Sequence, residues 1–179
     1  MQIFKNFLQR VLLLIIIFWL GGCAARGESM MGVPVAAIGH YGDMVGVSDY
    51  YVNGSRIGSA SGWGGGGAVS CCVMVPKNPM QPFSINVKWV TCDIRHIKYV
   101  NGLAVDPNRR CKEEVHEAAI PVNFAVTPDD SEGMYLHFLP GHRVEAWVSR
   151  VSPNSSKYPG PAYPRGVPPI YSPPEYPSK

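Results

Sequence analysis

Signatures of the common enzyme classes are missing from this chain of 179 residues. It has no G-x-S-x-G turn of a serine hydrolase, and its five histidines do not occur at spacings that resemble a metal motif. The glycine-rich stretch at residues 59–67 lacks the Gly-Lys-Ser/Thr ending of a phosphate-binding loop. We therefore predict a protein that is not an enzyme, with no catalytic site, metal site, cofactor or small-molecule substrate.

The chain also has little excess charge of either sign. Its formal net charge is +3, and loss of the first 22 residues, which include Lys5 and Arg10 but no acid, would lower it to +1. Because nucleic-acid binding depends on clustered positive charge, we expect no nucleic-acid partner.

Sustained apolar spacing of 3.6 residues is absent from residues 40–151, whereas alternation typical of half-buried strands recurs. Asn53-Gly54 follows one such segment and favours a tight hairpin turn. Residues 59–67 are too rich in glycine for a stable strand and are expected to form a loop. The pattern predicts an all-β domain over residues 38–151, an antiparallel sandwich of about seven strands. The alternating segments are residues 44–52, 83–91, 118–126, 134–139 and 143–151.

The N-terminus has the layout of a secretion signal. Basic residues precede an apolar run of ten residues, Val11 to Leu20, which is half of the roughly 20 that a membrane-spanning helix needs. The run ends in Leu20-Gly21-Gly22-Cys23, which resembles the bacterial lipobox. We expect a cleaved signal peptide at residues 1–22, a lipid on Cys23 and a tether at residues 23–37. Ala24 follows instead of the Asp of inner-membrane retention, so the expected location is the outer membrane, facing the periplasm.

Four further cysteines occur in the mature chain: Cys71, Cys72, Cys92 and Cys111. In an oxidising periplasm they predict one or two disulfides. Neighbouring strand residues point to opposite faces, so a bond between Cys71 and Cys72 is not expected. A bond between Cys92 and Cys111 would close an irregular loop. A zinc site is the alternative use of four cysteines, but no C-x₂-C pair is present. A thiol nucleophile at Cys71 or Cys72 is a further alternative.

Residues 152–179 hold nine of the 17 prolines and are expected to form an extended, mobile tail rich in Pro and Tyr. Recognition by a β-domain usually belongs to its loops. The candidate partner-binding residues are therefore an aromatic in the glycine-rich loop, an acidic turn and a hairpin connection. They are Trp63; Asp129, Asp130 and Glu132; and His142 and Arg143.

Several short segments together resemble a family of small bacterial lipoproteins known as a domain of unknown function. The resemblance covers roughly residues 35–160. Members of that family are similar to immunity proteins encoded beside type VI secretion phospholipase effectors. The segments are Gly64-Gly65-Gly66-Gly67, Cys71-Cys72-Val73-Met74-Val75-Pro76, Val87-Lys88-Trp89, Ile120-Pro121-Val122 and Tyr135-Leu136-His137-Phe138.

The resemblance implies a membrane-anchored periplasmic protein that binds and neutralises a phospholipase effector. A lipid anchor would hold such an inhibitor where the lipase attacks. The alternative is a structural or accessory envelope lipoprotein without a toxin partner, because an anchor, a β-domain and a proline-rich tail require nothing more.

Overall fold

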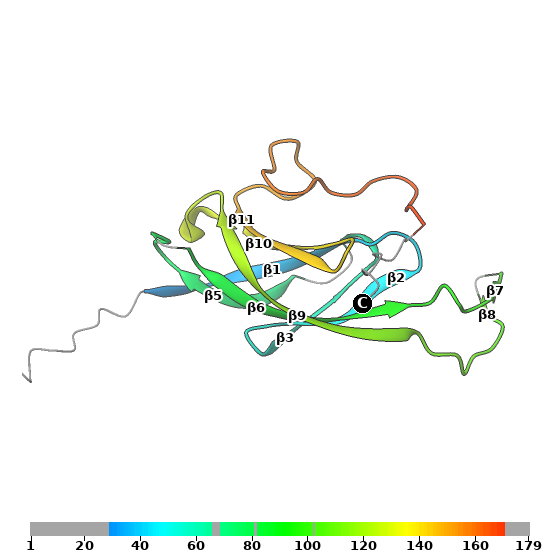
Figure 1. Ribbon diagram of the computed structural model, residues 1–179. Coiled ribbons are helices and arrows are strands. Elements are labelled where there is room, and N and C mark those ends of the chain that lie inside the picture. Colours follow the sequence, from blue (N-terminus) through cyan, green and yellow to red (C-terminus); the bar gives the residue numbers. More distant parts are fainter. Residues whose placement is uncertain (1–28, 66–68, 81, 102, 171–179) are drawn as a thin grey trace, which may run out of the picture.

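A computed structural model describes residues 29–65, 69–80, 82–101 and 103–170 (Figure 1). Strands dominate these residues, and the only helix among them is a short 3₁₀ turn, η1. The prediction of an all-β protein is confirmed. The elements are β1 (Met30–His40), β2 (Val45–Val52), β3 (Ser55–Ala60), β4 (Trp63–Gly65), β5 (Ser70–Pro76), β6 (Ser84–Asp93), β7 (Tyr99–Val100), β8 (Leu103–Ala104), β9 (Lys112–Phe124), η1 (Pro128–Asp130), β10 (Gly133–Leu139) and β11 (Arg143–Ser149).

The main sheet is mixed, which corrects the prediction of an antiparallel sandwich. Its strand order is β3-β2-β6-β9-β11-β10-β1-β4, and β5 pairs with β1. Two pairings, β1 with β10 and β11 with β9, are parallel. Alternation of side chains shows that one face of a strand is buried, but it carries no information on the direction of the neighbouring strand. The predicted hairpins β2–β3 and β10–β11 are both present.

The sheet curves until its two edge strands, β3 and β4, come close together. Gly39 and Gly62 permit this approach, because a Cβ on Gly39 would lie 1.8 Å from the Ser61 carbonyl oxygen and one on Gly62 would lie 1.9 Å from that of Val45. The predicted loop at residues 59–67 is therefore wrong in part. Pairing of β4 with β1 stabilises Trp63–Gly65 as a strand despite its glycines.

The inner face of the curved sheet forms one apolar core. Trp89, Tyr50 and Phe138 are among its largest side chains, and all three are almost fully buried. Tyr50 and Trp89 contact Phe138 through their rings, with centroids 5.4 Å and 6.1 Å apart. The core therefore joins strands from both halves of the sheet, β2 and β6 with β10.

Two disulfides are present, one unexpected and one predicted. Cys71 pairs with Cys72, contrary to the expectation from regular strand alternation. The pairing of β5 with β1 shifts register between Val33 and Val35, so β5 carries an extra residue where the two cysteines lie. Alternation fails at such a bulge. Cys92 pairs with Cys111, as expected.

Removing the Cys92–Cys111 bond should destabilise the domain. The bond links residues 19 positions apart, and in the chain-entropy model a loop of that size contributes about 3 kcal/mol. We expect Cys92→Ala/Cys111→Ala to lower the free energy of unfolding in urea by about that amount. Peptide mapping without reductant should recover the linked peptides from the wild type, and free thiols at both positions would contradict the pairing.

Both predicted boundaries of the domain need correction. Strand β1 starts at Met30, inside the predicted tether, because its residues pair with β5 and β10. At the other end, residues 152–170 lack regular strands but pack on the sheet instead of forming a mobile tail. Tyr158 is buried, and the Tyr163 hydroxyl accepts a hydrogen bond from the Gly65 amide at 2.8 Å.

The signal peptide, Cys23 and residues 171–179 lie outside the described residues. No helix in the described part of the chain has the length and apolar character to cross a bilayer.

Candidate functional site

The strands define two ends of the domain. Strand β1 enters at Met30 and finishes at His40, where it pairs with Trp63. The β10–β11 turn lies at that same end, because β10 runs parallel to β1. The end of β6 and the start of β9 also lie there (Figure 1). We call it the distal end, since it is opposite the end at which the chain enters from its N-terminus.

An arm projects from the distal end. It comprises residues 94–111, of which all but residue 102 are described, and includes the small β7–β8 hairpin beyond the main sheet (Figure 1). The Cys92–Cys111 disulfide closes its base. Ile97 is buried, but three apolar side chains toward the tip of the arm face solvent: Val100 is 52%, Leu103 is 74% and Val105 is 59% exposed. Exposed apolar side chains that gather in this way are typical of interaction surfaces.

The arm is also basic. Residues 94–111 contain four Arg or Lys and one acid, a net formal charge of +3 in a chain that is close to neutral once the signal is removed. Arg95 pairs with Asp93, and Arg109 lies 3.8 Å from Asp106. The arm thus has an apolar tip and a basic remainder, which we call its shaft. It would complement a partner surface in which acidic groups surround an apolar centre.

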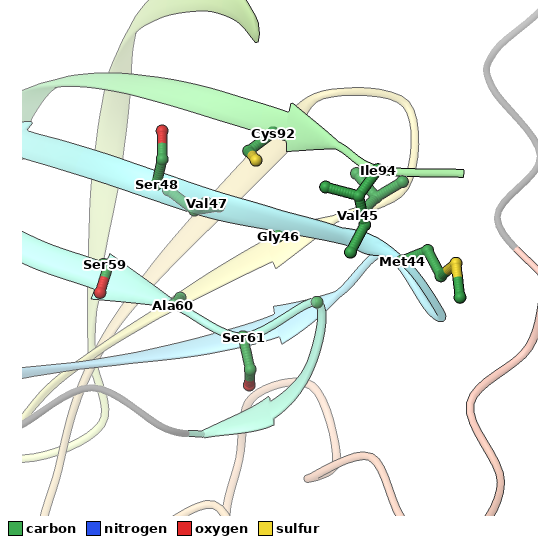
Figure 2. Close-up of a pocket in the computed structure, with 11 residues that line it drawn as sticks. Met44, Val45, Gly46, Val47, Ser48, Ser59, Ala60, Ser61, Cys92 and Ile94 are labelled. Atoms are coloured by element: carbon green, nitrogen blue, oxygen red, sulfur yellow. The ribbon is translucent and has the colours of Figure 1, made fainter. Parts of the chain in front are cut away.

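Two hollows meet at the base of the arm. One, of about 480 Å³, lies along β2 and the end of β3 and reaches Cys92 and Ile94 (Figure 2). The other, of about 630 Å³, lies in the arm and is lined by the same two residues together with Tyr99, Arg110 and others. The two hollows therefore share Cys92, one of the two residues of the disulfide.

The structure separates the partner-binding residues expected from the sequence into two groups. Trp63, His142 and Arg143 lie at the distal end. Asp129 and Asp130 are in η1, and Glu132 precedes β10, so these acids lie at the opposite end. The seven residues of β10 separate the groups by about 20 Å. Asp130 also pairs with Arg150 at 3.1 Å.

Trp63 does not lie in an exposed loop, contrary to the prediction from the sequence. It lies in β4 and is only half-buried, with an indole Nε1 that is buried and has no hydrogen-bond partner among the described residues. Its ring can still contribute to a distal surface, but the arm exposes more apolar area. Sequence reasoning missed the arm, because residues 93–110 lack the alternation that marks a buried strand.

A cluster of three side chains that the sequence did not connect also lies at the distal end. Glu114 and His116 are on β9, and His142 is in the β10–β11 turn, with all three potential ligand atoms within 4.8 Å of one another. The His116 ring stacks between His142, at a centroid distance of 4.0 Å, and Trp89, at 5.1 Å. His142 is 26 positions beyond His116 in the sequence, so no local spacing could indicate the contact.

A second histidine pair is buried beneath the C-terminal segment. His137 is fully buried in β10; its Nδ1 lies 2.9 Å from His40 Nε2, and its Nε2 lies 2.8 Å from the Tyr158 hydroxyl. Burial, and to a smaller extent the neighbouring His40, lowers the pKa of His137 to about 3. Its imidazole is therefore neutral in the folded protein at neutral pH, and it joins β1, β10 and residues 152–170.

This lowered pKa predicts acid destabilisation. Unfolding returns His137 to a pKa near 6.5, so the unfolded state binds more protons than the folded state between about pH 6.5 and pH 3. The contribution of His137 to the free energy of unfolding is fully present above that window and falls by about 1.4 kcal/mol per pH unit within it. We expect the free energy of unfolding, measured in urea, to be about 2 kcal/mol lower at pH 5 than at pH 7. Equal stability at both values would contradict a buried, neutral His137.

Comparison with known proteins assigns the chain to a family. The model of DUF3304, a protein family of unknown function, matches residues 42–146. This is more than half of the chain. The chain belongs to the DUF3304 family. No curated protein and no solved structure matches it.

The DUF3304 region contains β2 to β10 and the first part of β11. It therefore includes the arm, Trp63 and the cluster of Glu114, His116 and His142. Cys23, all of β1 and the C-terminal segment lie outside it. The arm, Trp63 and the cluster thus belong to the family domain, whereas His40 and the expected anchor do not.

Proposed function

We propose that this DUF3304 protein is a lipid-anchored protein of the outer membrane that binds and neutralises a phospholipase effector in the periplasm. The proposal combines the lipobox-like sequence at Cys23 with a β-domain that offers a recognition surface at its distal end. The lipid holds the domain beside the phospholipids, and the domain binds the enzyme that attacks them. Acyl chains contribute about 0.8 kcal/mol per buried methylene, so several together anchor a protein firmly.

The observation that carries the proposal is the basic, apolar arm opposite the end where the chain enters. Strand β1 has 11 residues and spans about 35 Å at about 3.3 Å per residue. A lipid attached before β1 leaves the arm on the side of the domain away from the anchor. The arm is therefore presented to a protein arriving from the periplasm.

A binding role needs no catalytic chemistry from this chain. An interface of ordinary size, about 800 Å² on each partner, supports nanomolar affinity when a few apolar anchors are well buried. Val100, Leu103 and Val105 supply such anchors, and the two hollows at Cys92 accept side chains from the partner. The basic shaft would speed association with an acidic surface.

Co-purification tests the proposal. The full chain, extracted from membranes in detergent, should retain a phospholipase encoded by a neighbouring gene, at one enzyme per chain and through washing in moderate salt. A complex that does not form with the purified enzyme, or neighbouring genes that encode only cell-wall or secretion machinery, would instead support a structural or accessory envelope role.

A further inference from the structure

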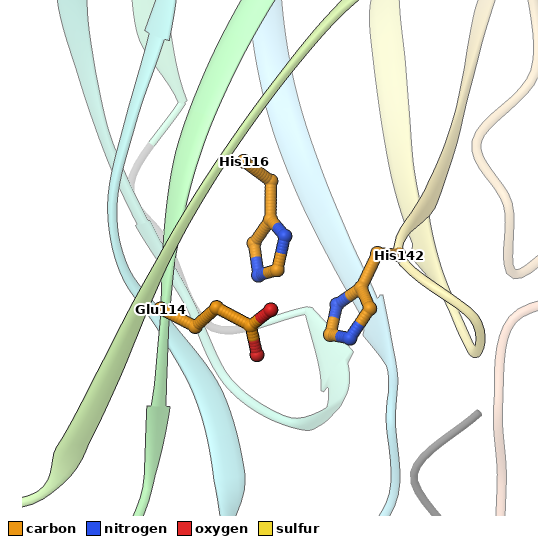
Figure 3. A group of neighbouring side chains, drawn as sticks. All are labelled: Glu114, His116 and His142. Carbon is orange, nitrogen blue, oxygen red and sulfur yellow. The ribbon is translucent and has the colours of Figure 1, made fainter. Parts of the chain in front are cut away.

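We infer that Glu114, His116 and His142 form a binding site for a divalent transition metal, and that zinc suits them best. Zinc binds imidazole nitrogen and carboxylate oxygen at about 2.0–2.2 Å, so two ligand atoms on one ion lie about 3.3 Å apart. The three side chains converge on one point from two separate segments, with ligand atoms within 4.8 Å of one another (Figure 3). Rotation of the side chains, above all of one imidazole ring, would bring them to ligating distance.

The three side chains come from two places in the backbone, one strand and one turn. Glu114 and His116 are two residues apart on β9, so their side chains lie on the same face of the strand. His142 follows Gly141 in the β10–β11 turn, and both have positive φ, 55° and 78°. This tight turn places the His142 ring directly over the His116 ring, although the two residues are far apart in the sequence.

Thr91 provides a second-shell contact to the His116 ring. The buried Thr91 hydroxyl donates to the Glu114 carbonyl oxygen at 3.3 Å and lies 3.0 Å from His116 Nε2. When the hydroxyl hydrogen is used in the bond to the carbonyl, the hydroxyl accepts from the Nε2 proton of His116, and the lone pair of that ring is then on Nδ1. Histidine ligands are commonly held by a second-shell acceptor of this kind.

His142 supplies a second nitrogen that the protein leaves unsatisfied. Its Nδ1 is buried and has no hydrogen-bond partner among the described residues, and a buried polar atom without a partner is unfavourable. A metal ion would satisfy it.

Metal binding must change the histidine stack. The two rings are nearly parallel, at 18° to each other, whereas a bound ion lies in the plane of each ligating ring. One ring therefore has to turn. His142 is the candidate, because it lies in a turn between the exposed residues Gly141 and Arg143, and turning its ring would also change its contact with Tyr41, at a centroid distance of 6.1 Å. Three protein ligands leave a fourth position open on zinc, available to water or to a group of a bound partner.

Zinc titration of the full chain tests the site. The chain is purified in detergent with its disulfides intact, without reductant, so that cysteine thiols do not bind the ion. Calorimetry should find one zinc ion per chain. Glu114→Gln and His142→Asn should each weaken binding by at least about 100-fold, and Thr91→Val by about 10–100-fold, the usual effect of losing a second-shell partner.

His96→Ala is the matched control, because His96 is another half-buried histidine at the base of the arm but lies outside the cluster. It should bind zinc as the wild type does. Melting curves without zinc confirm that each variant is folded. Zinc affinity unchanged by Glu114→Gln and His142→Asn, or no zinc bound by the wild type, would overturn the inference. Neither result depends on the identity of a protein partner, so the site and the proposed function are tested separately.

Discussion

Replacing Cys23 with alanine should move the protein from the membrane fraction to the soluble periplasmic fraction. In the proposed lipoprotein the Cys23 thiol receives the lipid, and the apolar run before it has ten residues, too few to span a bilayer. The expected effect is close to all-or-none, because a membrane affinity built from several acyl chains is lost in one step. Fractionation followed by immunoblotting measures it, and labelled palmitate should mark the wild type alone.

The domain itself should be unaffected by this change. Among the described residues its first strand starts at Met30 and its buried core at Val33, with Met31 packed against it. The alanine variant should therefore melt at the temperature of the wild-type domain and keep its affinity for the phospholipase. Wild-type protein without palmitate label, or an alanine variant that stays in the membrane fraction, would show that the chain is not a lipoprotein.

Leu103→Asp should greatly weaken binding to the phospholipase. Leu103 is the most exposed of the arm's apolar side chains, at 74%, and a charge there would have to be desolvated against an apolar partner surface. Truncating an anchor at the centre of an interface typically costs at least about 2 kcal/mol, which is about 30-fold in affinity. We expect a loss of at least that size by calorimetry or surface binding.

Met80→Asp is the control for this variant. Met80 is also a large, exposed apolar residue, at 87%, but it follows β5 at the end of the domain where the chain enters. Both variants should melt like the wild type, since neither side chain is buried. Equal losses of affinity for the two variants, or no loss for Leu103→Asp, would place the interface away from the arm.

Strand content could be predicted from the sequence because it depends on local alternation. The Asn53-Gly54 turn and the β10–β11 hairpin are examples, each determined by a few neighbouring residues. The parallel pairing of β1 with β10 could not be predicted, since it joins residues about 100 positions apart. The Cys71–Cys72 pair was missed for a related reason. It depends on a bulge opposite Pro34, which arises from the pairing with β1.

The C-terminal segment was misjudged because composition describes only its local preferences. Its prolines prevent regular strands, as expected, but Tyr158 and Tyr163 find partners on the sheet at His137 and Gly65. The cluster of Glu114, His116 and His142 shows the same limit. Glu114 and His116 lie on the same face of one strand because they are two positions apart. Nothing near them in the sequence indicates His142, which a distant turn brings into contact.

Inhibition of the enzyme tests the proposed function most directly. Phospholipid hydrolysis by the phospholipase encoded beside this gene is measured while the purified full chain is added. Phospholipase activity should fall linearly with added chain and reach zero at one chain per enzyme. With Leu103→Asp, the same inhibition should need a much higher concentration of the chain. Full phospholipase activity in the presence of an excess of the wild-type chain would contradict the proposal that this DUF3304 protein neutralises such an effector.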